Sequence, residues 1–348
     1  MEYNRPIVIC EQGKLVGTQE KQALAFYNVP YGADKGRFMP VGEPVTWSGT
    51  REATTPGPVF PQLPSRLSTV LGTKKEELNQ KEDAFSLNIW TKDTNKKRPV
   101  LFWIHGGGWL TGGGSLPWYN GSDLVTNEDG DVVVVTVNYR LGALGNLFLP
   151  GISEGNLALK DLIAALHWVK KNIEAFGGDP DLITVAGQSA GAWYSVALMA
   201  CEEVQCMFNR TALFSFPACT KALNESASLE LSNLLLERLG IDERNKEKIL
   251  DVPIEQILSS QTEVTRELAC HCIDLPFVFG NFEKWDNAPM LEDIHLEEAQ
   301  NLSDQVQGYF LRFIKNGSPN HENSLDWLVF ERNHRNVLLF DKKIELKS

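Results

Sequence analysis

Residues 182–193 read Leu-Ile-Thr-Val-Ala-Gly-Gln-Ser-Ala-Gly-Ala-Trp, and this stretch decides the predicted fold. The apolar run 182–186 predicts a buried strand, and residues 192–200 predict a helix. The pentapeptide 187–191 between them has the pattern Gly-x-Ser-x-Gly. A serine at such a sharp strand-to-helix turn adopts a strained backbone that lifts its hydroxyl clear of the sheet. We therefore interpret Ser189 as a candidate nucleophile rather than part of an ordinary Gly/Ser-rich loop.

A second glycine-rich motif follows an earlier apolar run. His105-Gly106-Gly107-Gly108 comes directly after the predicted strand 100–104. Consecutive glycines allow backbone N–H groups to face one point and hold a negatively charged oxygen there. A phosphate-binding loop is the rival interpretation, but no Gly-Lys-Ser/Thr or G-x-G-x-x-G pattern completes it. We therefore expect an oxyanion hole from this loop, with a further N–H group from Ala190.

The order of the predicted elements indicates an α/β fold. Apolar runs typical of buried parallel strands occur at 100–104, 132–137, 183–186 and 212–216. Helical spacing over 159–176, closed by Gly177-Gly178, predicts a helix between the second and third runs. We expect a mostly parallel central sheet with helices on both faces, in one domain spanning residues 1–348.

The flanking segments predict simpler elements. Residues 7–30 predict antiparallel strands and hairpins, and Ser86 to Thr91 alternates like a half-buried strand. Residues 30–80 are mostly loop. Further elements are expected downstream, namely helices at 225–239, 254–258 and 296–314 and a last short strand at 337–340.

Bulk properties exclude several classes of function. The 348 residues carry a formal net charge of −12, which disfavours general binding to nucleic acid or anionic membrane. No apolar run approaches the roughly 18 residues of a membrane span. The N-terminus lacks a signal-peptide pattern and the six cysteines are sparse, so we expect a cytoplasmic protein. The opposing signal is a set of Asn-x-Ser/Thr sequons, which matter only in a secreted chain; they begin at Asn120, Asn209, Asn224 and Asn301.

His271 is the candidate general base among the six histidines. It lies downstream of the serine, as the chain order serine, acid, histidine requires, and an apolar segment anchors it from residue 275 onward. The flanking Cys270 and Cys272 raise a metal interpretation. In an extended chain, however, those two side chains point away from the histidine. We therefore expect no metal and no cofactor.

These motifs together resemble the type B carboxylesterases, the carboxylesterase/cholinesterase group of α/β-hydrolases. Residues 176–191 resemble that family's serine signature over its full length, and residues 82–90 resemble its second signature. In the second signature Ala84 stands where secreted members carry a disulfide cysteine. Other familial segments are 26–32, 37–38, 47–49, 137–142, 155–161 and 270–280.

The resemblance implies specific roles. Ser189 would be acylated, His271 would act as general base, and Gly107, Gly108 and Ala190 would form the oxyanion hole. The partners implied are a small carboxylic ester, of moderate acyl or aromatic type, and water. The resemblance leaves the oligomeric state open.

Departures from the family pattern concern the surroundings of the serine and the acid of the triad. Gln188 replaces a common glutamate, and residues 214–217 replace the usual Gln-Ser-Gly after the next strand. The step from Gln261 to His271 bridges a stretch that in the family holds helices, further strands and the acid, so the sheet is expected to be truncated after residue 216. Glu263 and Glu267 are candidate acids, and an acid missing from its usual place is the alternative.

Two hypotheses about function follow from the sequence. The first is a serine carboxylic-ester hydrolase working through an acyl-enzyme. The second is a catalytically silent relative that serves as a binding or interaction module, which the shortened segment motivates. The retained serine, glycine loop and histidine favour the first.

Overall fold

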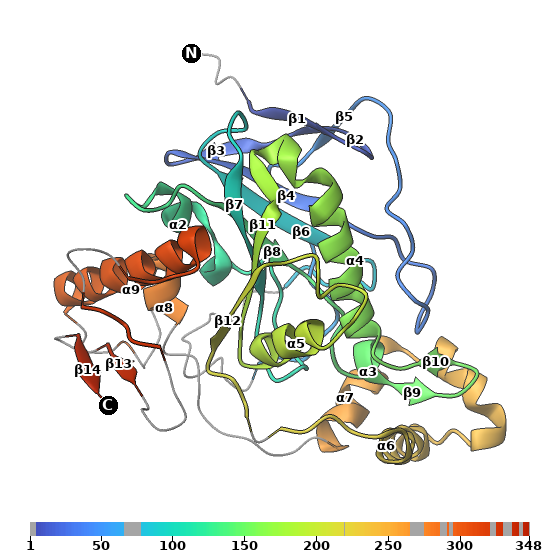
Figure 1. Cartoon of the computed structure of the whole chain (residues 1–348). Helices are drawn as coiled ribbons and strands as arrows, with labels where there is room; N and C mark the ends of the chain where they lie inside the picture. Colours follow the sequence, from blue (N-terminus) through green and yellow to red (C-terminus); the bar gives the residue numbers. More distant parts are fainter. Residues whose placement is uncertain are drawn as a thin grey trace.

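A seven-stranded sheet forms the centre of the computed structural model (Figure 1). The structure describes residues 5–65, 78–218, 220–264, 275–285, 291, 295–320, 325–329, 336–340 and 344–347. The strand order in the sheet is β12-β11-β7-β8-β6-β4-β3. These strands are β3 (Thr18–Glu20), β4 (Ala23–Pro30), β6 (Ser86–Thr91), β7 (Arg98–Ile104), β8 (Val133–Val137), β11 (Gly178–Gln188) and β12 (Arg210–Phe214).

The sheet is mixed, with a parallel half and an antiparallel half. β12, β11, β7 and β8 run parallel to one another, whereas β6, β4 and β3 pair antiparallel. The expected parallel core and N-terminal antiparallel strands are thereby confirmed. In a parallel arrangement the carboxyl ends of β7, β8, β11 and β12 share one edge of the sheet, which is where α/β proteins place their sites.

Alternate residues of the central strands pack into two separate hydrophobic clusters. In β7, Val100, Phe102 and Ile104 join a cluster with α4 (Leu157–Asn172). Leu101 and Trp103 join a second cluster on the other face, with α9 (Leu296–Asn316). Figure 1 shows α4 and α5 on one side of the sheet and α9 on the other. Both faces are covered, so the apolar runs are continuous rather than alternating.

The expectation of a half-buried strand at Ser86 to Thr91 is wrong. All six residues of β6 are buried, because the strand lies inside the sheet between β8 and β4. Its polar side chains are hydrogen-bonded. The Asn88 amide donates to the Gly114 carbonyl and to Thr136 Oγ1, and the Thr91 hydroxyl donates to the Asp93 carbonyl. The polar half of the alternation therefore marks internal hydrogen bonds and not a solvent-facing side.

The remaining elements surround this sheet. The expected downstream helices are present, and α7 (Ile254–Val264) is longer than the pattern indicated. The other helical segments are η1 (Pro117–Tyr119), α2 (Ser122–Thr126), α3 (Gly142–Asn146), η2 (Ile173–Phe176), α5 (Ala190–Met199), α6 (Glu225–Arg238), η3 (Glu243–Asp251), α8 (Leu275–Phe279) and η4 (Phe282–Trp285). The other strands are β1 (Ile7–Cys10), β2 (Gly13–Val16), β5 (Thr50–Glu52), β9 (Phe148–Leu149), β10 (Ser153–Glu154), β13 (Val337–Leu339) and β14 (Glu345–Lys347).

β12 is the last strand at its end of the sheet among the described residues. Phe214 nevertheless packs inward, with its ring centroid 5.5 Å from that of Trp103 and 5.0 Å from that of Phe310. An edge strand at this position agrees with the expected truncation after residue 216. Within the described part of the chain, no helix has the length and apolar character needed to cross a membrane.

A buried ion pair fixes the segment that follows β8. Asp161 on α4 is fully buried and accepts hydrogen bonds from the Arg140 backbone N–H, Nε and Nη2 at 3.0, 2.9 and 2.6 Å. Arg140 also donates to the Met39 carbonyl. The main chain at residue 140 is therefore tied to α4.

Asp161→Ala should lower the free energy of unfolding by about 3–5 kcal/mol, because Arg140 would keep a buried charge without its partner. Asp181→Ala is the matched control. Its carboxylate pairs with Lys170 at 2.9 Å and is exposed, so its removal should lower the free energy of unfolding far less than Asp161→Ala does. Urea denaturation followed by circular dichroism measures both values. Equal losses in the two variants would contradict this account.

Candidate active site

Ser189 occupies a strained turn between β11 and α5. Its φ is 56° and its ψ is −121°, a conformation rare for a residue with a side chain. β11 ends at Gln188 and α5 begins at Ala190, so strand and helix meet at this single residue. Ser189 keeps 8% exposure, whereas Gln188 has 1% and Ala190 has 0%. Ser189 is therefore the most accessible of these three residues.

Two glycines make this turn sterically possible. A Cβ added at Gly187 would lie 2.4 Å from the Gly191 carbonyl carbon. A Cβ added at Gly191 would lie 2.0 Å from the Ile104 carbonyl oxygen at the end of β7. Real Cβ contacts essentially never fall below 3.0 Å. Both positions therefore require glycine, and Gly191 also brings the turn against β7.

The edge strand and the new helix hold the serine from two sides. The Ser189 N–H donates to the Phe214 carbonyl at 2.9 Å, at the end of β12. The Ser189 carbonyl accepts the Trp193 N–H at 3.1 Å within α5. The N–H groups of the first helical residues have no intrahelical acceptor by helix geometry, and the helix dipole places partial positive charge there. The surroundings of the hydroxyl thus favour a developing negative charge.

The glycine loop that follows β7 lies directly beside the serine. A Cβ added at Gly106 would lie 3.1 Å from Ser189 Cβ and 2.3 Å from Gln188 Oε1. The next three residues all have positive φ, at 123° for Gly107, 60° for Gly108 and 62° for Trp109. Only glycine adopts such angles without strain, so Trp109 must be held by its contacts.

The segment 138–142, which follows β8, supplies these contacts. The Asn138 side-chain oxygen accepts the Gly114 N–H at 2.8 Å, and the Tyr139 hydroxyl donates to the His105 carbonyl at 2.7 Å. The Gly142 N–H donates to the Trp109 carbonyl, also at 2.7 Å. Each bond fixes a different point of the glycine loop. Residues 138–142 therefore hold the loop next to Ser189, and we call this segment the template.

A further contact closes the far end of the loop. Gln62 is buried, its side-chain oxygen accepts the Gly112 N–H at 2.8 Å, and its amide donates to the Gly112 carbonyl at 2.7 Å. Sequence reasoning missed the roles of Gln62 and Asn138. The motif at 137–142 marked Asn138 as familial, whereas no sequence signal pointed to Gln62.

His105 is structural in this arrangement. Its ring is fully buried, stacked on Tyr139 with the centroids 4.3 Å apart, and Nδ1 lies 2.8 Å from the Gly106 carbonyl. That geometry makes Nδ1 the protonated nitrogen. Burial lowers the pKa of the imidazole to about 4, against a smaller opposing effect of the Gly106 carbonyl. A neutral, buried His105 is unsuited to exchange protons with a substrate.

The structure brings together part of the predicted site. Ser189 and Ala190 follow the carboxyl end of β11, and Gly107 and Gly108 come directly after Gly106, which lies against Ser189 at the carboxyl end of β7. His271 and Glu267 lie outside the described residues, and Glu263 is in the last turn of α7. Among the residues that the structure describes, no group of three or more His, Cys, Asp or Glu side chains is placed to bind a metal ion.

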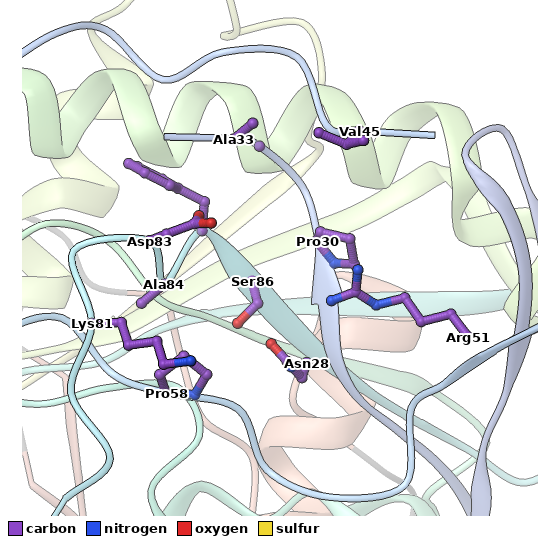
Figure 2. A pocket seen from close by; sticks show the side chains of 12 residues that line it. Asn28, Pro30, Ala33, Val45, Arg51, Pro58, Lys81, Asp83, Ala84 and Ser86 are labelled. Carbon is purple, nitrogen blue, oxygen red and sulfur yellow. The ribbon is translucent and has the colours of Figure 1, made fainter. Parts of the chain in front are cut away.

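A cavity of about 270 Å³ lies at the other end of the same sheet edge (Figure 2). Its lining includes Asn28 from β4, Arg51 from β5 and Ser86 from β6, with the exposed Lys81 and Asp83. β7 and β8 separate β4 and β6 from β11, so this cavity is not the site of Ser189. The Asn138 amide donates to the carbonyls of the lining residues Pro58 and Ala84, and thereby joins this wall to the template.

The low pKa of His105 predicts a pH dependence of stability. The unfolded chain takes up a proton below about pH 6.5, whereas the folded chain stays neutral there until about pH 4, so stability falls as the pH falls. Between pH 7 and pH 5 the wild-type loss should exceed that of His105→Phe by about 2 kcal/mol. Urea unfolding at both pH values measures this difference. An equal loss of stability in the wild type and in His105→Phe would contradict a lowered pKa of His105.

Comparisons with known proteins agree with this geometry. Residues 4–264 match the model of the carboxylesterase family. The para-nitrobenzyl esterase of Bacillus subtilis is 38% identical over 265 residues, covering 74% of this chain and 53% of that protein. The phenmedipham hydrolase of Pseudarthrobacter oxydans is also 38% identical, over 76% of this chain and 53% of its own.

The structural alignment covers more of the chain than the sequence alignments do. A solved carboxylesterase of Geobacillus stearothermophilus has a TM-score of 0.87 at 25% identity, and the alignment covers 99% of this chain and 97% of that chain. In sequence, the chain spans about half the length of the curated relatives it matches. On the family match and the shared α/β-hydrolase fold, this chain belongs to the carboxylesterase family.

Proposed function

We propose that this protein is a serine hydrolase of carboxylic esters, with Ser189 as the nucleophile. The observation that carries the proposal is the packing of the strained Ser189 turn against the glycine loop after β7. Strain of this kind persists only where the surrounding structure enforces it, and it clusters at active sites. Membership in the carboxylesterase family supports the same chemistry.

In the proposed first half-reaction, Ser189 Oγ attacks the carbonyl carbon of the ester while His271 takes the hydroxyl proton. The carbonyl oxygen becomes negatively charged and accepts hydrogen bonds from the N–H groups of Gly107, Gly108 and Ala190. Collapse of this intermediate breaks the bond to the alcohol oxygen, which leaves with the proton from His271. The acyl group is then bound to Ser189.

The second half-reaction repeats these steps with water. His271 takes a proton from a water molecule, whose oxygen attacks the acyl carbonyl, and the same three N–H groups hold the oxyanion. The bond between the acyl carbon and Ser189 Oγ then breaks, Oγ takes the proton back from His271, and the carboxylic acid leaves. In measured systems, loss of one oxyanion donor lowers the turnover about 10²–10³-fold, so the contacts that hold the glycine loop in place should contribute to the rate.

Two glutamates are candidates for the acid of the triad. Glu263 is the candidate within α7, with Glu267 as the other. A histidine without this partner still has a basic ring nitrogen, but its tautomer and orientation are no longer fixed. In a well-studied triad this loss lowers the turnover about 10⁴-fold. We therefore propose a slow hydrolase in the event that neither glutamate reaches His271.

Aromatic side chains beside the serine support small or aromatic esters as substrates. The rings of Trp109 and Trp193 lie edge to face with centroids 6.0 Å apart, and Trp193 is four residues after the nucleophile. One of the relatives, the para-nitrobenzyl esterase, is named for an ester with an aromatic group. We propose an ester of moderate acyl size with an aromatic leaving group as the first substrate to assay.

A fluorophosphonate probe should label Ser189, because it reacts with a serine whose attack is assisted by a base and an oxyanion hole. Peptide mass analysis should place one adduct on the segment around residue 189. Ser189→Ala should abolish labelling, and His271→Ala should slow it at least about a thousandfold.

Two variants serve as controls for this experiment. Ser195→Ala removes another hydroxyl of α5, which donates to the Gly191 carbonyl, and should leave labelling intact. His167→Ala removes an exposed histidine of α4 and should also have no effect. A chain that binds no probe would favour the silent binding module, and equal labelling in His271→Ala would contradict the role of His271 as general base.

A further inference from the structure

Gln261 connects helix α7 to the template behind the glycine loop. Its side chain is buried, and its amide oxygen accepts the Ala143 N–H at 2.7 Å. A Cβ added at the neighbouring Gly142 would lie 2.3 Å from that oxygen and 2.7 Å from Gln261 Nε2. The amide therefore lies directly over Gly142, and residue 142 must be a glycine for this contact.

The contact continues from Gly142 to the loop itself. Gly142 has a φ of 52°, and its N–H donates to the Trp109 carbonyl at 2.7 Å. Gln261 thus binds the N–H group that follows Gly142, while the N–H group of Gly142 itself binds the Trp109 carbonyl. Because Trp109 is a non-glycine residue at a φ of 62°, it would relax toward ordinary angles without this hold. Such a change would turn the peptide between Gly108 and Trp109.

Helix α7 presents Gln261 from a fixed position. Arg37 donates from Nη1 to the carbonyls of Leu250 and Val252 at 3.2 and 2.5 Å, just before the helix begins. The same guanidinium forms a two-point ion pair with Glu82, at 2.9 and 2.6 Å. The helix is therefore anchored before its first residue by Arg37 and in its last turns by Gln261.

We infer that Gln261 is a positioning residue of the proposed oxyanion hole, acting on it through Ala143, Gly142 and the Trp109 carbonyl. The inference rests on the proposed function. A residue in this role stabilises the transition state and not the bound ester, because the oxyanion exists only during the reaction. Its loss should therefore lower kcat and leave KM nearly unchanged.

The test compares Gln261→Leu with Gln261→Glu on a p-nitrophenyl ester of moderate acyl length. Leucine keeps the volume but removes the acceptor for the Ala143 N–H, so kcat should fall about tenfold at constant KM. Glutamate keeps an acceptor oxygen and should hold kcat within about threefold of the wild type. Gln256→Leu, on an exposed position of the same helix, should leave both constants unchanged.

Turnover is expressed per serine labelled by the fluorophosphonate, so that unfolded molecules do not contribute. Three results would overturn the positioning role and leave the proposed esterase function intact. They are an unchanged kcat in Gln261→Leu, an equal fall of kcat in Gln261→Glu and Gln261→Leu, and a change in KM without a change in kcat. A wild-type chain without labelling and turnover would overturn the proposed function, and this inference with it.

Discussion

The close contact between Gly191 and the Ile104 carbonyl is the constraint on which the rest of the site depends. A Cβ at residue 191 would lie 2.0 Å from the Ile104 carbonyl oxygen, so only glycine fits there. As a result, α5 starts directly over the end of β7. That contact places the Ser189 turn, which belongs to β11 and α5, beside the loop that belongs to β7. Two stretches that lie 87 residues apart in sequence, measured from Ile104 to Gly191, thereby form one surface at the carboxyl edge of the sheet.

Backbone strain at this surface is balanced by contacts from buried polar groups. Positive φ angles at Ser189 and Trp109 are unfavourable for their own residues and persist because neighbours hold them. Asn138, Tyr139 and Gly142 hold the loop, and the ion pair of Arg140 with Asp161 holds that template to α4. The stability of the fold and the geometry of the proposed oxyanion hole therefore depend on the same five-residue segment.

Local patterns in the sequence predicted much of this arrangement, whereas contacts between distant residues were beyond them. The Ser189 turn, its two glycines and the strands on either side follow from spacing and residue type alone. The bonds of Gln62 to Gly112 and of Gln261 to Ala143 join residues 50 and 118 positions apart, with no local signal. Burial of β6 was underestimated for a related reason, since its polar residues are satisfied by other strands and loops.

The loop after β7 and the start of α5 are proposed to form an oxyanion hole at Ser189. A crystal structure of the protein phosphonylated at Ser189 tests it most directly. The claim predicts the phosphonyl oxygen within about 2.7–3.1 Å of the nitrogen atoms of Gly107, Gly108 and Ala190. A phosphonyl oxygen that points into solvent, or that bonds to none of these nitrogens, would contradict it.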